Sequence, residues 1–189
     1  MPFDLDRYLI RRKILKILGA SFHIYDTAEK VVGFSDQKAF KLREDIRIYT
    51  DESMNDELLV IKARQIVDFA AAYDVVDARE GRKVGAARRK GFSSLVRDSW
   101  ELLDANDQPI AQLQEDSMMM AVLRRFLSNL IPQHFQLRTT SGEEAADFRV
   151  RFNPFVYKLE VDIVPNTSVD RRLILGAGVL MAAIEGRQK

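Results

Sequence analysis

The sequence predicts a mainly β protein, a closed antiparallel barrel of about twelve strands around one buried C-terminal helix, with an amphipathic helix outside. Two observations predict this fold. Short alternating segments separated by polar turns recur along the chain, and residues 173–184 form an uncharged run near its end. We interpret residues 1–189 as a single domain, because this length can bury one core and is short for two.

Alternating hydrophobic segments followed by turn-forming residues predict β-hairpins. The clearest pairs are 22–26 with 31–33, 73–77 with 84–86, and 100–104 with 110–111, while 46–51 and 135–139 repeat the pattern more loosely. Asp, Asn and Gly between the segments favour tight turns. Five or six such hairpins supply about ten to twelve strands. Residues 8–18 fit a strand or a short amphipathic helix, and the hairpins that follow favour the strand.

The run 173–184 predicts a helix that lies inside the protein. It is apolar on every face, so it must be enclosed, yet it is shorter than the roughly 20 residues that a bilayer crossing needs. Asp170 is the expected N-cap and Gly186 the expected stop. A barrel of about twelve strands has a radius of roughly 12 Å, which suits one helix of about 10–12 Å diameter on its axis.

Residues 117–131 predict the second helix, outside the barrel. Met118, Val122 and Phe126 follow one another at helical spacing, and Pro132 ends the segment. Arg124 and Arg125 lie on another face, so we expect the apolar face to pack on the sheet.

The composition excludes several classes of function. The chain has no cysteine, which excludes disulfides, zinc–thiolate sites and cysteine nucleophiles. Its formal net charge of +1 gives no overall field that would direct it to nucleic acid or membrane. No signal peptide pattern opens the sequence, so we expect a cytoplasmic protein, with peripheral contact at the membrane as an alternative.

Three stretches resemble the LURP-one-related and phospholipid scramblase-like family, which has the tubby C-terminal-like fold. Residues 11–26 resemble its first hairpin, 68–85 its middle hairpins, and 170–185 its charged lead-in and central helix. The resemblance implies no agreed catalytic activity. It implies a module that binds phosphoinositides or other anionic phospholipids, or a scaffold for a protein partner. The Pro-rich N-terminal region and the palmitoylated cysteines of scramblases are absent, so lipid scrambling is not expected.

A basic cluster is the candidate binding site for an anionic ligand. Its members are Arg82, Lys83, Arg88, Arg89 and Lys90. These cations could hold a phosphorylated lipid head group or, as a second reading, the phosphates of a nucleic acid. The structural alternative is a solvated hairpin whose charges are balanced by Asp and Glu elsewhere in the chain. We favour lipid over nucleic acid because of the family resemblance.

No catalytic or metal-binding constellation is recognisable in the sequence. His23 and His134 have no partner at metal-ligand spacing, so we interpret both as structural. Phosphate loops, nucleophile elbows and zinc motifs are absent. We therefore expect no enzyme, no cofactor and no metal site. An enzyme with its site at the barrel mouth stays open as an alternative.

Overall fold

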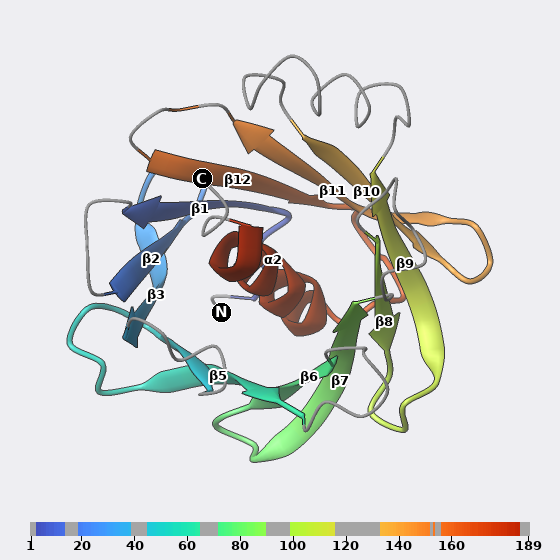
Figure 1. Cartoon of the computed structure of the whole chain (residues 1–189), viewed down its shortest axis with the longest axis horizontal. Coiled ribbons are helices and arrows are strands. Elements are labelled where there is room, and N and C mark those ends of the chain that lie inside the picture. The colour runs from blue at the N-terminus through green and yellow to red at the C-terminus, as the bar shows by residue number, and fades with distance from the viewer. Residues whose placement is uncertain are drawn as a thin grey trace.

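Twelve antiparallel strands close into a barrel around one helix in the computed structural model (Figure 1). The model describes residues 3–13, 19–38, 45–64, 72–89, 99–115, 133–151, 153 and 156–185. The strands are β1 (Arg7–Lys13), β2 (Gly19–Tyr25), β3 (Val31–Lys38), β4 (Ile46–Tyr49), β5 (Glu57–Ala63), β6 (Ala72–Asp77), β7 (Arg82–Arg89), β8 (Ser99–Leu103), β9 (Pro109–Glu115), β10 (His134–Thr139), β11 (Glu144–Arg151) and β12 (Val156–Ile163), and the helix is α2 (Arg171–Glu185). The predicted fold class is confirmed.

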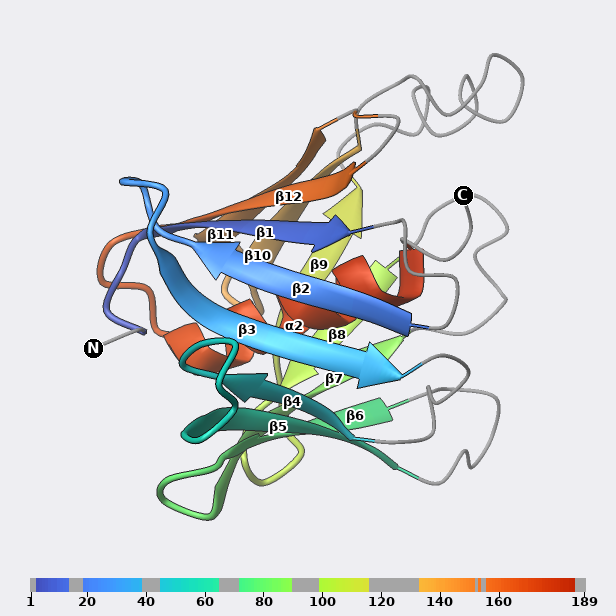
Figure 2. The ribbon, with the colours of Figure 1, turned by 90° about the vertical axis from the view of Figure 1, so that its left-hand side faces the viewer.

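Each strand pairs with its neighbours in the sequence, and β1 closes the barrel against β12. The closing seam is regular from Arg7↔Asp162 to Lys13↔Val156, which also settles residues 7–13 as strand. Figure 2 shows that the described turns between strands gather at the end of the barrel where α2 begins. The predicted amphipathic helix, residues 117–131, lies outside the described residues.

The repeated Asp at the end of a strand has a common structural cause. Asp26 Oδ1 accepts the backbone N–H groups of Ala28 and Lys30, and Asp104 Oδ1 accepts those of Asn106 and Gln108, at 2.8–2.9 Å. Asp77 likewise accepts two backbone N–H groups of the following turn. These side chains satisfy turn donors that the strands leave free. The sequence repeat is therefore a repeat of hairpin turns.

Helix α2 fills the barrel axis, as predicted. Residues 173–183 are all buried, and the helix contacts β1, β5, β6, β7 and β12. Asp170 is the N-cap, because its Oδ1 accepts the backbone N–H of Arg172 at 2.8 Å. The predicted stop, Gly186, lies outside the described residues.

Glycine allows the closest approaches between the helix and the strands. A Cβ atom on Gly85 of β7 would lie 2.4 Å from the Leu103 carbonyl oxygen and 2.8 Å from Cδ2 of Leu173. On the helix, a Cβ atom at Gly176 would lie 3.0 Å from Val75 Cγ2. A side chain at either position would therefore require its neighbours to shift.

Candidate functional site

The structure divides the predicted basic cluster into two parts. Arg82 and Lys83 begin β7, whereas Arg88 and Arg89 end it, and Lys90 lies outside the described residues. Lys83 and Arg88 are five positions apart on an extended strand, about 17 Å at the usual rise of a strand. The described cations of this cluster therefore do not converge on one ligand-sized site.

Carboxylates neutralise three of these cations. Arg82 pairs with Glu80 and Arg88 with Glu101, whose side chain is 7% exposed. Lys83 Nζ lies 2.6 Å from Asp107 Oδ1. Hydrogen bonds from Arg64 and Lys83 lower the pKa of Asp107, which keeps this partner ionised. This surface presents bound pairs of charges, which attract an external anion weakly.

Ion pairing of this kind extends over the barrel. Eleven arginines of the described residues pair with Asp or Glu: Arg7, Arg11, Arg47, Arg64, Arg79, Arg82, Arg88, Arg149, Arg151, Arg171 and Arg172. Arg12 lies over the ring of Phe22. Arg138 lines a groove on the outer surface of the barrel.

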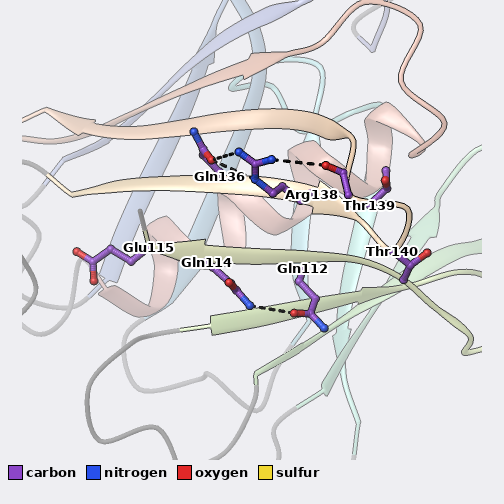
Figure 3. Close-up of a pocket in the computed structure, with 8 residues that line it drawn as sticks. Gln112, Gln114, Glu115, Gln136, Arg138, Thr139 and Thr140 are labelled. Atoms are coloured by element: carbon purple, nitrogen blue, oxygen red, sulfur yellow. Dashed lines mark hydrogen bonds between the residues drawn. The ribbon is translucent and has the colours of Figure 1, made fainter. Parts of the chain in front are cut away.

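A polar groove crosses β9 and β10 on the outer face of the barrel. Its volume is about 500 Å³, and it is lined by Gln112, Gln114, Glu115, Gln136, Arg138, Thr139, Thr140 and Gly142. Strand alternation turns these glutamines outward, because Leu113 and Leu137 between them are buried. The register sets Gln112 opposite Arg138 and Gln114 opposite Gln136. In Figure 3, the side chains of Gln112 and Gln114 extend from β9 away from β10, and those of Gln136 and Arg138 extend from β10 away from β9.

Neutral groups hold the guanidinium of Arg138. Its Nε and Nη2 donate to Gln136 Oε1 at 3.2 and 2.7 Å, and its Nη1 lies 3.5 Å from the Gly142 carbonyl oxygen. Across the groove, Gln114 Nε2 donates to Gln112 Oε1 at 2.9 Å. The groove therefore offers hydrogen-bond donors and one positive charge, a set that can bind an anion or a polar group.

Sequence reasoning missed this groove. The pattern of residues 135–139 predicts a strand, and nothing in the sequence singles out Arg138. The available signal was the spacing Gln112-Leu113-Gln114 and Gln136-Leu137-Arg138, which places two polar side chains on one face of each strand. The pairing of β9 with β10, which brings these faces together, is not visible in either segment alone.

The two histidines lie on different strands, and each contacts one carboxylate. His23 of β2 is buried between the rings of Tyr25 and Phe34, and its Nε2 lies 2.5 Å from Glu52 Oε1. His134 of β10 pairs with Asp147 of β11. Within the described ranges, no three His, Asp or Glu side chains are arranged to hold a metal ion. Both histidines have the surroundings of structural residues.

A second cleft, of about 370 Å³, lies where α2 begins, and its residues secure the helix. Arg172 Nη2 and Nη1 lie 2.7 Å from Asp170 and 2.8 Å from Asp77, and Arg171 Nη1 donates to the Leu5 carbonyl oxygen at 2.7 Å. Burial raises the pKa of Asp77, but backbone N–H groups and Arg172 outweigh it, so the pKa is lowered overall. The charges of this cleft serve the fold.

The comparisons with known proteins identify a family. No helix in the described part of the chain combines the length and apolar character needed to cross a bilayer. A search of curated proteins gave no match. The model of the family described as LURP-one-related matches residues 31–182, which include β3–β12 and most of α2. The chain therefore belongs to the LURP-one-related family.

Proposed function

We propose that this LURP-one-related protein is a non-catalytic binding or scaffold module that meets an anionic ligand on the outer surface of its barrel. The observation that carries the proposal is the filled barrel axis. Residues 173–183 are buried inside the barrel, so protein occupies the space in which a barrel of this size would otherwise enclose a ligand. Recognition is therefore expected on the outside, where the polar groove and the paired charges lie.

The ligand that we propose is the head group of an anionic phospholipid, phosphoinositide or other. The family resemblance and the basic residues of β7 support this choice. Lys83 and Arg88 each reach the surface beside a carboxylate partner, so the electrostatic attraction to a membrane is expected to be modest and sensitive to salt. If the protein does not bind lipid, we propose that it serves as a scaffold for a protein partner.

Flotation with liposomes tests the lipid. The purified full chain is mixed with neutral vesicles and with vesicles that contain a phosphoinositide or phosphatidylglycerol, at low and at physiological salt. Flotation only with the anionic vesicles, retained at physiological salt, supports the proposal. Absence of flotation at both salt concentrations removes the lipid and leaves the protein scaffold.

Charge reversal tests the predicted contact residues. The substitutions to Glu are made at all five positions together, and separately at the two groups, Arg82 with Lys83 and Arg88 with Arg89 and Lys90. Flotation that is unchanged after these substitutions contradicts this site. Salt-sensitive binding to DNA, without binding to anionic vesicles, would replace the lipid by nucleic acid, and turnover in a substrate screen would contradict the non-catalytic part of the proposal.

A further inference from the structure

We infer that the polar groove between β9 and β10 is a binding site for a small oxyanion, a phosphate or carboxylate group, with Arg138 as its anchor. This inference goes beyond the proposed function, since it concerns a different surface from the β7 cations and a ligand group that can be free in solution. The inference rests on one observation: neutral groups hold Arg138 in a groove that is lined by amides and hydroxyls.

Arg138 keeps its positive charge available. Eleven other arginines in the described ranges pair with carboxylates. Arg138 instead donates to an amide oxygen of Gln136 and a backbone carbonyl of Gly142, and neither group carries a formal charge. An arginine that is hydrogen-bonded but not neutralised attracts an anion without first giving up an ion pair.

The guanidinium is also held in one orientation. Two of its nitrogens share Gln136 Oε1, and the third lies near the Gly142 oxygen. A guanidinium has five N–H donors, so these three contacts leave two for a ligand. The turn beside it is fixed by the Thr139–Ser141 hydroxyl contact of 2.7 Å and by the hydrogen bond from Glu143 N to Thr139 Oγ1 at 3.1 Å. Little side-chain entropy remains to be lost when an oxyanion binds.

Other donors line the groove beside Arg138. The Oε1 of Gln112 accepts from Gln114, so the amide NH₂ of Gln112 is left as a donor in the lining of the groove. Thr140 adds a hydroxyl at the edge of the groove. Apart from Gly142, every residue that lines the groove has a polar side chain, which suits an oxyanion with hydroxyl or amide neighbours.

Two carboxylates near the groove limit the attraction without removing it. Glu115 lines one end, and Figure 3 shows its side chain pointing away from Arg138. Glu144 stands opposite Arg138 in the register of β10 and β11, whereas the guanidinium hydrogen bonds of Arg138 within the described residues go to Gln136 and Gly142. We expect a weak site, with millimolar affinity for an isolated oxyanion at physiological salt.

Titration of the full chain with inorganic phosphate tests the site. The Nε–Hε signals of the arginines are followed by NMR at constant ionic strength, with acetate as a carboxylate probe. We expect a saturable shift of the Arg138 signal and little change at Arg47, which is paired with Glu57 on another part of the barrel. Shifts that are equal at the two arginines, or a linear drift without saturation, would overturn the inference.

Three variants separate a site from a general effect of charge. Arg138→Gln should weaken phosphate binding about tenfold or more, the scale of one hydrogen bond to a charged group. Arg47→Gln removes the same charge from β4, where Arg47 is paired with Glu57, and should leave the affinity nearly unchanged. Gln136→Glu keeps the shape of the groove and the arginine but supplies a carboxylate, so binding should again fall about tenfold. Unchanged affinity in Gln136→Glu, with its fold intact by circular dichroism, would overturn the inference.

Vesicles distinguish the source of the oxyanion. Wild type and Arg138→Gln are compared by flotation with phosphatidylcholine vesicles that do or do not contain phosphatidic acid. If wild type floats with phosphatidic acid vesicles and Arg138→Gln does not, the groove binds a lipid phosphate. If phosphate shifts the Arg138 signal but wild type does not float, the groove binds a soluble oxyanion. Flotation of wild type and variant alike, with no shift at Arg138, contradicts the groove while the proposed lipid function stands.

Discussion

Arg88 of β7 and Arg138 of β10 lie in one row across the outer face of the barrel, yet only one of them is neutralised. The register runs from Arg88 to Glu101, from Glu101 to Gln112, and from Gln112 to Arg138. Arg88 pairs with the carboxylate of Glu101, whereas Arg138 has the amides of Gln112 and Gln136 as neighbours.

The difference teaches that the neighbours across the strands decide what a basic residue can do. The sequence around Arg88 is rich in positive charge, and the sequence around Arg138 is not. The dense cluster is nevertheless paired at Arg82, Lys83 and Arg88, because acidic residues of adjacent turns and strands face it. An isolated arginine among glutamines keeps more of its field.

The largest effect is expected at Gly85 of β7, which lies against the backbone of β8 and against Leu173 of the helix. Gly85→Ala puts a Cβ atom 2.4 Å from the Leu103 carbonyl oxygen, which belongs to the backbone and cannot rotate away. We expect a loss of about 3 kcal/mol or more in the free energy of unfolding, measured by denaturant titration. Gln112→Ala, on the outer face of the groove, is the control and should stay within about 0.5 kcal/mol of wild type.

Replacement of each arginine by Met tests the difference between Arg88 and Arg138 directly. Arg88→Met leaves the Glu101 carboxylate, 7% exposed, without its guanidinium. We expect a cost of about 1–3 kcal/mol in the free energy of unfolding at neutral pH. Arg138→Met leaves only neutral partners and should cost about 0.5 kcal/mol or less. Equal losses in the two variants, by thermal or urea unfolding, would show that Arg88 and Arg138 do not differ in this way.

An exchange of partner sharpens the comparison further. Glu101→Gln has nearly the same shape as the native side chain but gives Arg88 a neutral neighbour, as Arg138 has. We expect a new phosphate-dependent shift of the Arg88 Nε signal, with a gain in affinity of about fivefold, the scale of a 1 kcal/mol exposed ion interaction. A variant that remains folded and leaves the Arg88 signal insensitive to phosphate would contradict the role assigned to the carboxylate.

The smallest effect concerns the pH dependence of the paired surface. The pKa of Asp107 is lowered from 3.8 by hydrogen bonds from Arg64 and Lys83. A lowered folded-state pKa contributes stability above the unfolded value, and this contribution is lost as the pH falls through the folded-state pKa. Lys83→Gln should raise the pKa of Asp107, a change that carboxyl ¹³C NMR can follow in acid. An unchanged titration would mean that Lys83 does not hold this carboxylate.

The fold was largely predictable because its signals are local. The hairpins at 22–33, 73–86 and 100–111 repeat an alternating segment that ends in Asp, and that Asp satisfies donors of its own turn. The helix 173–184 is apolar on every face, so enclosure was the expected outcome. Whether residues 7–13 form strand or helix was not decided locally, and the seam with β12 settles it.

The candidate site was less predictable because the carboxylates that neutralise a basic residue are distant from it in the sequence. Lys83 and Asp107 are 24 residues apart, and Arg88 and Glu101 are 13 apart, so the segment 82–90 gives no sign of its partners. Gln112 and Arg138 meet only because β9 and β10 are adjacent in register. A pattern of residue types identifies which side chains face outward, but the neighbours across the strands are long-range information.

The sequence by itself determined the architecture of this protein, because periodicity, turn chemistry and one apolar run are properties of short segments. Only the tertiary structure decided that Arg82, Lys83 and Arg88 are neutralised, whereas Arg138 is held by neutral groups. The physical reason is that electrostatic interactions act over a few ångströms in space, and the barrel brings together residues that are far apart in the chain.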